Sequence, residues 1–145
     1  QMCIRDRGSL AGMAPLQGAA TYSATKAGLR AFAFALADEL QDTSINVGVV
    51  SPGPIDTGFI MSEIDIVEDI VFSQPMSSAD DVADAVLSIA RGEKTEIAMP
   101  AASGRLVTLS YLFPALRRFM RPRLYAKGLK NKDKYRNRSA VNKGL

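Results

Sequence analysis

The sequence of 145 residues contains no histidine, no tryptophan and a single cysteine. Without histidine, these residues cannot form a Ser-His-Asp triad, a Cys-His pair or a histidine-ligated metal site. The single cysteine, Cys3, cannot form a disulfide within the chain, so a reducing compartment is expected. We therefore expect no metal site within these residues.

A long apolar run is also lacking. The nearest candidate, residues 106–120, is interrupted by Pro114, Arg117 and Arg118, and a membrane-spanning helix needs roughly 20 apolar residues. The first residues are charged and lack the apolar segment of a signal peptide. A cytoplasmic protein is therefore expected, and 47% hydrophobic residues are enough for a buried core.

Charge is distributed unevenly along the chain. Residues 1–116 contain 7 basic and 14 acidic residues, whereas residues 117–145 contain 11 basic residues and one acid. We interpret residues 117–145 as a basic C-terminal tail, poorly ordered from Arg121 onward. Three roles remain open for this tail: peripheral membrane contact next to an apolar helix around Phe113 and Phe119, nucleic-acid binding, which no recognised motif supports, and a solvated tail.

The hydrophobic pattern predicts an α/β fold with a parallel sheet. Apolar residues at helical spacing predict a helix over 22–41, and a second helix is expected from Ser78, a good N-cap, to a stop at Gly92. Strands are predicted over 45–51 and 96–99, a short helix within 59–72, and helix on either side of Pro114. Two strands leave a parallel sheet without partners for its buried faces, so we expect part of the domain to lie outside this sequence.

A tyrosine and a lysine are placed four residues apart in Tyr22-Ser-Ala-Thr-Lys26. On a helix, such residues share one face, with Cβ atoms roughly 5–6 Å apart. A lysine cation favours the phenolate form of a neighbouring tyrosine, which helps the phenol to exchange a proton with a carbonyl or an alcohol. Taken alone the pair is weak evidence, because an exposed tyrosine and lysine on a helix have the same spacing.

Two further segments flank this pair. Ser9 lies 13 residues before Tyr22 in Gly8-Ser-Leu-Ala-Gly12, and a predicted strand leads into Pro52-Gly-Pro-Ile-Asp-Thr57. The set resembles the short-chain dehydrogenase/reductase family, in which these three motifs follow in the same order. The resemblance covers residues 8–100 and implies a Rossmann-type doubly wound parallel sheet. It also implies an NAD(P)-dependent oxidoreductase that interconverts a carbonyl and an alcohol by hydride transfer.

The resemblance also implies roles for individual residues. Tyr22 matches the general acid/base, Lys26 the residue that assists the phenol and holds the nicotinamide ribose, and Ser9 the hydroxyl that orients the substrate oxygen. The positions of the cofactor-binding residues match Tyr22 and Lys26 together with Pro52, Gly53, Ile55 and Thr57. The cofactor is expected to be NAD or NADP, a choice that residues outside this sequence would make.

An apolar segment, residues 59–72, matches the position of the family's mobile substrate cover. It contains nine apolar side chains, including Phe59 and Met61, and so favours an apolar, lipid-like substrate. The alternative is that these side chains only pack on the domain.

The chain departs from the family in two ways. It contains no Gly-rich phosphate-binding turn, so residues 8–116 are interpreted as the C-terminal part of the dinucleotide-binding domain, with roughly 100–120 residues missing. Residues 1–7 do not suit a buried parallel strand, and we interpret them as a non-native or misjoined start. The isolated chain is therefore expected to fold poorly and to be inactive.

Three functional classes are kept open. An oxidoreductase is favoured; a non-catalytic binding protein with a dinucleotide fold is the main alternative; and a sugar-nucleotide epimerase or dehydratase is disfavoured by the short C-terminal region. A small-molecule substrate is expected in the first case. Small residues on the helix that carries Tyr22, such as Ala24 and Ala31, favour a homo-oligomer formed through that helix.

Overall fold

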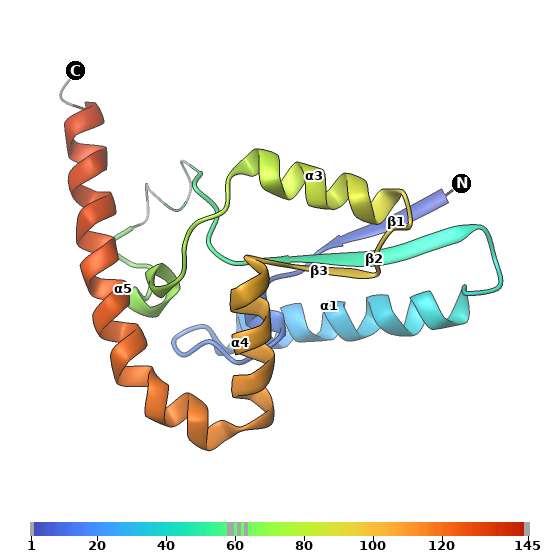
Figure 1. Cartoon of the computed structure of the whole chain (residues 1–145), viewed down its shortest axis with the longest axis horizontal. Coiled ribbons are helices and arrows are strands. Elements are labelled where there is room, and N and C mark those ends of the chain that lie inside the picture. The colour runs from blue at the N-terminus through green and yellow to red at the C-terminus, as the bar shows by residue number, and fades with distance from the viewer. Residues whose placement is uncertain (1, 58–59, 61, 63, 144–145) are drawn as a thin grey trace.

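In the computed structural model, which describes residues 2–57, 60, 62 and 64–143, a parallel sheet lies between helices (Figure 1). The elements in chain order are β1 (Met2–Arg7), the 3₁₀ helix η1 (Leu10–Gly12), α1 (Ala20–Glu39), β2 (Ile45–Pro52), the 3₁₀ helix η2 (Asp69–Ser73), α3 (Ala79–Ala90), β3 (Glu96–Met99), α4 (Ala101–Leu112) and α5 (Pro114–Lys143).

The three strands are parallel and lie in the order β1-β2-β3, with Ile4 opposite Val47 and Val50 opposite Ile97. The central strand β2 is buried from Val47 to Pro52. Its run of valines suits this position, because a central parallel strand is covered on both faces. The strands predicted over 45–51 and 96–99 are thus confirmed.

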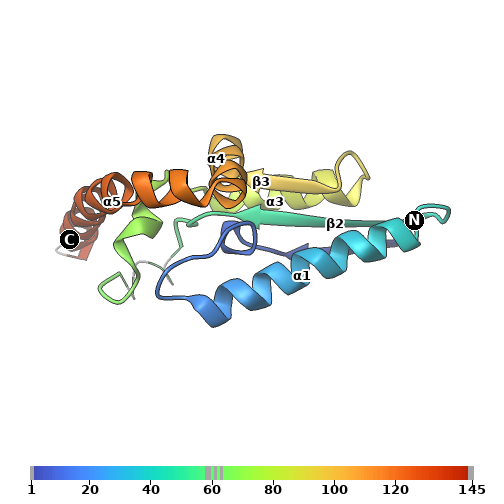
Figure 2. The same ribbon diagram turned by 90° about the horizontal axis from the view of Figure 1, so that it is seen from below.

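Helices cover both faces of the sheet, as a doubly wound fold requires. On one face, Ala33 of α1 packs with Val47 and Val49. On the other, Val82 and Ile89 of α3 pack with Val50, together with other α3 side chains. Figures 1 and 2 show α1 and α3 on opposite sides of β2. The predicted fold class is therefore confirmed.

The first turn of α3 is stabilised by the predicted cap. The Ser78 hydroxyl accepts a hydrogen bond from the Asp81 N–H at 3.0 Å, and the Asp81 carboxylate accepts one from the Ser78 N–H at 3.0 Å. These bonds satisfy N–H groups that a helix start leaves free. The Ser78 hydroxyl also donates a hydrogen bond to the Asp81 carboxylate at 2.6 Å. This bond, followed by the one from the Ser78 N–H, holds the pKa of Asp81 below its usual range.

The start of the chain corrects one expectation. Residues Met2–Arg7 form β1, which pairs in parallel with β2 over six residues, whereas their charged side chains were expected not to suit a parallel strand. Backbone hydrogen bonding is open to almost any side chains, which explains why composition alone misses such a strand. The interpretation of residues 1–7 as foreign to the protein stays a prediction, because strand pairing does not test it.

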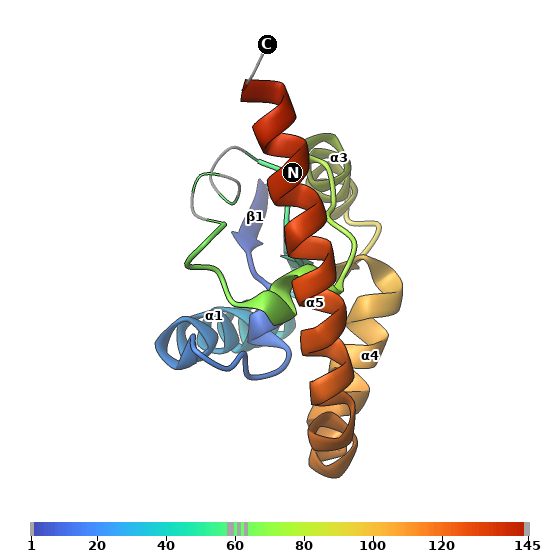
Figure 3. The same cartoon turned by 90° about the vertical axis from the view of Figure 1, so that its left-hand side faces the viewer.

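The C-terminal segment corrects another. The expected poorly ordered tail is instead the long helix α5, Pro114–Lys143. Figure 3 shows α5 running past η2 and α4. Contacts with η2 order this helix, and the charge composition alone does not predict such contacts. Across the described residues, no helix is both long enough and apolar enough to cross a membrane.

The predicted short helix within 59–72 is found in part. Ile60 and Ser62 are helical, and η2 covers Asp69–Ser73. Phe59 and Met61 lie outside the described residues. Together with η1, α4 and α5, η2 lies toward the carboxyl ends of the strands (Figure 1), where open α/β sheets bind their ligands.

Candidate active site

Ser9 is placed by a tight turn directly after β1. It is the N-cap of η1, and its hydroxyl oxygen accepts a hydrogen bond from the Ala11 N–H at 3.2 Å. A serine hydroxyl can accept and donate at once. The proton of Ser9 can therefore be directed to another acceptor while the oxygen stays fixed by the turn.

Glycine at position 12 lets η1 lie close to α1. A Cβ atom at Gly12 would lie 2.6 Å from the Lys26 carbonyl oxygen and 3.2 Å from the Ala27 nitrogen. Both atoms belong to helix backbone, which cannot move aside cheaply. The absence of a side chain therefore allows the turn that carries Ser9 to contact the helix that carries Tyr22.

Tyr22 and Lys26 share one face of the first turns of α1, as their spacing predicts. The Lys26 Nζ atom lies 5.7 Å from the centroid of the Tyr22 ring, within the range of a cation–π contact. Tyr22 is 47% exposed. Its phenol is thus reachable from outside the helix while a cation lies beside the ring.

Ser9 and Tyr22 line one cavity of about 280 Å³, together with Gly53 at the end of β2. Motifs from three separate segments therefore meet around one space. The other predicted site residues, Lys26, Pro52, Ile55 and Thr57, are not part of its lining. Further lining comes mostly from apolar side chains of the loop after η1, of η2, of α4 and of α5.

The backbone after β2 is tightly held. The Gly53 N–H donates to the Met99 carbonyl at 2.7 Å, and the Thr57 N–H donates to the Ile55 carbonyl at 2.8 Å. A Cβ atom at Gly53 would lie 3.2 Å from both Leu10 and the Met99 carbonyl oxygen. The Pro52-Gly53 step therefore forms a close, fixed wall at this end of the sheet.

The apolar segment after this wall divides into two groups. Ile60, Ile70 and Val71 line the cavity, whereas Ile64 and Phe72 are buried. Some side chains of the segment thus line the cavity and others pack on the domain, and its role as a substrate cover stays a prediction.

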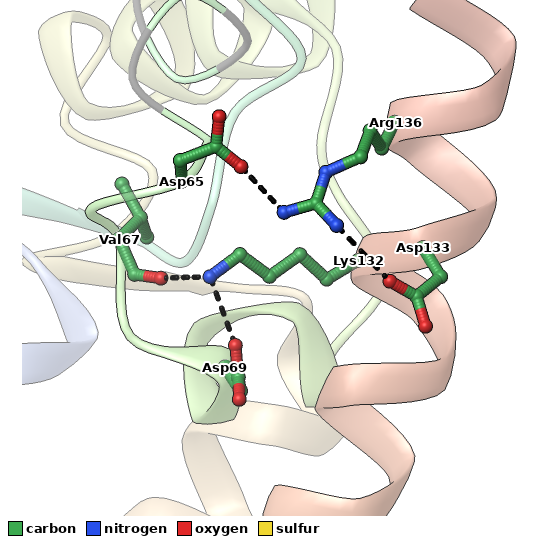
Figure 4. Close-up of polar contacts among 6 residues, drawn as sticks. All are labelled: Asp65, Val67, Asp69, Lys132, Asp133 and Arg136. Atoms are coloured by element: carbon green, nitrogen blue, oxygen red, sulfur yellow. Dashed lines mark hydrogen bonds and ion pairs between the residues drawn. The ribbon is translucent and has the colours of Figure 1, made fainter.

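Helix α5 holds this segment in place through polar contacts (Figure 4). The Lys132 ammonium, 7% exposed as a residue, donates to the Val67 carbonyl at 2.7 Å and to the Asp69 carboxylate at 2.9 Å. Arg136 pairs with Asp65, which raises the pKa of Arg136 above its usual value. We call Lys132 and Arg136, with their partners, the α5 clamp.

An ion pair joins α1 to β3. Arg30, one turn after Lys26, donates to both oxygens of Glu96 at 2.6 and 2.8 Å. This bidentate contact raises the pKa of Arg30, and such pairs fix orientation as well as charge. The helix that carries Tyr22 is thereby anchored to the edge strand of the sheet.

Two cavity residues have no signal in the sequence motifs. Gln74 lines the cavity, and its Oε1 atom is buried without a hydrogen-bond partner in the described part of the chain. Arg117 reaches the cavity from α5. Neither stands near Ser9 or Tyr22 in sequence, so only the fold brings them there. Across the same residues, no three potential His, Cys, Asp or Glu ligands are grouped to hold a metal ion.

Residues 7–65 match the family described as short chain dehydrogenase. The chain is 34% identical over 80 residues to the acetoacetyl-CoA reductase of Allochromatium vinosum, covering 52% of this chain and 32% of that protein. It is 40% identical over 52 residues to the uncharacterized oxidoreductase YjdA of Bacillus subtilis, covering 36% of this chain and 21% of that protein.

Solved structures agree with this match. A short chain dehydrogenase from Burkholderia cenocepacia in complex with NADP superposes with a TM-score of 0.61 at 26% identity, over 84% of this chain and 48% of that one. A 4-hydroxyisoleucine dehydrogenase complexed with NADH has the same fold, with a TM-score of 0.52 at 22% identity, over 67% of this chain and 44% of that one. The matches span less than half the length of each of these four relatives. The motif order, the parallel sheet and the match over residues 7–65 agree, and together they support a fragment of the short-chain dehydrogenase/reductase family.

Proposed function

We propose that the full-length protein is an NAD(P)-dependent oxidoreductase that interconverts a carbonyl and an alcohol, with Tyr22 as its general acid/base. The observation that carries this proposal is the shared cavity. The hydroxyls of Ser9 and Tyr22 belong to two different elements, yet both residues line the same space beside Gly53. A carbonyl oxygen in that space would have two hydroxyl donors within one cavity, as this chemistry requires.

The residues present fit a nicotinamide cofactor. Gly53 leaves the wall without a side chain, and the buried Gln74 Oε1 atom beside it has no donor among the described residues. In this proposal Lys26 holds the ribose hydroxyls, Pro52 and Gly53 form the wall for the ring, and the Ile55 backbone and Thr57 hold the carboxamide. When bound, the cofactor supplies or accepts a hydride. The two structural relatives are complexes with NADP and NADH, which supports NAD or NADP as the cofactor here.

The proton is handled by the chain's own residues. In the reducing direction the Tyr22 hydroxyl gives its proton to the substrate oxygen as hydride reaches the carbon, so a C–H and an O–H bond form together. Ser9 donates a hydrogen bond to the same oxygen, while its own oxygen is held by the Ala11 N–H. The Lys26 cation, 5.7 Å from the Tyr22 ring centroid, stabilises the charge left on the phenol. In the oxidising direction the same groups act in reverse.

Replacement of Tyr22 by phenylalanine in the full-length protein tests the proposal. Tyr22→Phe should lower turnover at least about 100-fold, the usual contribution of a positioned proton donor. Cofactor binding, followed by NAD(P)H fluorescence, should be retained. Tyr135→Phe is the matched control, because it removes a hydroxyl on α5 and keeps the ring that packs on Phe72. A wild-type protein that binds the cofactor but turns over no carbonyl or alcohol would favour the non-catalytic binding protein instead.

The isolated chain is expected to be inactive. The family's Gly-rich turn for the cofactor pyrophosphate has no counterpart in this sequence. Measurable NAD(P)H oxidation by the 145 residues alone would contradict this part of the proposal.

A second candidate, action at a membrane surface on a lipid-like substrate, is favoured by one observation. Where α4 meets α5, four large apolar or aromatic side chains are more than half exposed beside arginines. We call this surface the α4–α5 corner; it consists of Tyr111, Leu112, Phe113 and Phe119. Exposed aromatic side chains next to cations suit the interface of an anionic membrane. Apolar cavity walls from Ile60, Ile70 and Val71 are compatible with such a substrate.

A further inference from the structure

A groove of about 900 Å³ adjoins the apolar cavity that contains Ser9 and Tyr22. One of its walls is the loop after η1 and the exposed side of α1, and the other is formed by α4 and α5. The second wall includes Tyr111, Arg117, Arg118, Arg121 and Tyr125. The groove is larger than the cavity and, unlike it, has several charged side chains.

Its charge has one sign. Four arginines line the groove and no aspartate or glutamate does. Arg30 is already neutralised by its bidentate pair with Glu96. Arg117, Arg118 and Arg121 have no carboxylate partner among the residues that the structure describes. The groove therefore has three positive charges that nothing in the described chain balances.

Two other cations on the same helix do have carboxylate partners. Further along α5, Lys132 and Arg136 are paired with Asp69 and Asp65 of the acidic body. The three arginines in the groove instead face loop, alanine and tyrosine side chains. An anion bound in the groove would supply the missing countercharge.

Tyr125 adds an unsatisfied polar group. Its hydroxyl is buried and has no hydrogen-bond partner in the described chain, while the Arg121 guanidinium lies 5.4 Å from the centroid of its ring. A buried hydroxyl that stays unpaired is unfavourable, because it has lost its hydrogen bonds to water. A ligand oxygen in the groove could accept from it, next to the arginine that stacks on the same ring.

The groove and the cavity share part of their lining. Arg117 and Leu124 of α5, and Ile70 of η2, line both. One ligand can therefore occupy both spaces, with a small carbonyl-bearing part beside Ser9 and Tyr22 and a larger part among the arginines. The shared position of Arg117 lies at the junction of the two parts.

We propose that the groove binds the phosphate-bearing part of the substrate, whose carbonyl enters the apolar cavity. Phosphate is favoured over a single carboxylate because three arginines line one groove, and guanidinium groups match phosphate oxygens bidentately. This inference rests on the proposed oxidoreductase function and names its substrate class. We assign this phosphate to a soluble ester, and measurements with vesicles distinguish it from contact with the lipid headgroups of a membrane.

The test compares two thioesters with the same reacting carbonyl in the full-length protein. Acetoacetyl-CoA has phosphates, and the thioester of acetoacetate with N-acetylcysteamine has none. Arg118→Gln and Arg121→Gln should each raise KM for the first about 10- to 100-fold, the value of one hydrogen bond to a charged group, and leave kcat unchanged. Neither variant should alter KM for the second. Arg123→Gln is the matched control, because Arg123 lies on the same helix but over the Phe119 ring rather than in the groove lining.

A binding measurement separates this inference from the proposed function. Coenzyme A without an acyl group, titrated calorimetrically, should bind the wild type and Arg123→Gln, and should bind Arg118→Gln and Arg121→Gln about 10- to 100-fold more weakly. That result supports the groove even if neither thioester is reduced, in which case only the proposed function fails. Equal effects on both thioesters, or coenzyme A binding that the variants do not change, would overturn the inference.

The last measurement is binding of the wild type and Arg118→Gln to vesicles that contain phosphatidic acid. If Arg118→Gln weakens coenzyme A binding in the absence of vesicles, the groove recognises soluble phosphate esters. If it weakens only binding to vesicles and leaves coenzyme A binding unchanged, the arginines contact a membrane surface, and the groove is not a substrate site.

Discussion

Gly12 on η1 lies against the backbone of Lys26 on α1, so that a Cβ atom at Gly12 would lie 2.6 Å from the Lys26 carbonyl oxygen. This close approach joins the turn that carries Ser9 to the helix that carries Tyr22. Position 12 thus has a structural reason to be glycine that is independent of turn geometry. It also couples stability to catalysis, because any separation of η1 from α1 moves the two hydroxyls apart.

Gly12→Ala should therefore destabilise the full-length protein and lower kcat/KM. Backbone must move to admit the methyl group, and overpacking of this kind costs about 1–3 kcal/mol. Urea denaturation and carbonyl-reduction kinetics measure the two effects. Gly28→Ala is the matched control, because Gly28 lies on α1, the helix that Gly12 contacts. Apart from the neighbouring backbone of α1, no described atom lies within 4 Å of a Cβ at Gly28. Alanine there should raise helix stability by about 1 kcal/mol. Equal stability of the two variants would contradict the argument.

The features that could be predicted from the sequence are those whose causes lie within a few neighbouring residues. The start of α3 follows from Ser78 and Asp81, because a capping box is formed by residues three apart. The same holds for β2, whose valines suit a buried strand. The pairing of Tyr22 with Lys26 follows from helix geometry alone. The site could be predicted to this extent because each of its motifs is short and continuous.

Contacts between distant residues explain what the sequence could not predict. Helix α5 is ordered against η2 by Lys132 and Asp69, which are 63 residues apart, whereas a run of cations with one acid suggests disorder. Gln74 and Arg117 enter the cavity for the same reason: the fold brings them together, and no motif marks them. Strand β1 was missed because its pairing depends on backbone groups and on its neighbour β2.

The α5 clamp should affect substrate binding more than the chemical step. Lys132→Met keeps the aliphatic stem but leaves the Val67 carbonyl and the Asp69 carboxylate without their donor. We expect a loss of about 2–3 kcal/mol in unfolding free energy. We also expect a higher KM with a smaller change in kcat, because η2 supplies Ile70 and Val71 to the cavity wall.

Lys130→Met on the same helix is the control for this prediction, because Lys130 is exposed. It removes one positive charge, as Lys132→Met does. Lys132→Arg, which can still donate to Asp69, should restore part of the lost affinity. If kcat fell while KM stayed constant, Lys132 would not act through the position of η2.

The capping box of α3 should make stability depend on pH in the acid range. The pKa of Asp81 is held below its usual value near 4, first by the Ser78 hydroxyl and then by the Ser78 N–H. A lowered pKa in the folded state means that this stabilisation is complete above the usual value and is lost as pH falls through the lowered one. Asp81→Asn should therefore be less stable than the wild type at pH 7 and should approach it at pH 2–3. Urea denaturation at both pH values measures this, and Asp80→Asn, one residue earlier in the same turn, controls for the change in net charge. A constant difference between Asp81→Asn and the wild type at both pH values would argue against it.

The α4–α5 corner should bind anionic membranes if the second candidate function holds. Phe113 and Phe119 are 58% and 65% exposed, and burying each ring in a membrane interface would contribute about 1.5–3 kcal/mol. The full-length protein should cosediment with vesicles containing phosphatidylglycerol, and less so with phosphatidylcholine alone or at high salt, which screens the arginines. Phe113→Ser and Phe119→Ser should each weaken this binding about tenfold or more. Phe32→Ser, which removes another exposed phenylalanine on the separate helix α1, should leave it unchanged. Binding that all three variants reduce equally would reflect general loss of apolar surface rather than a specific contact at this corner.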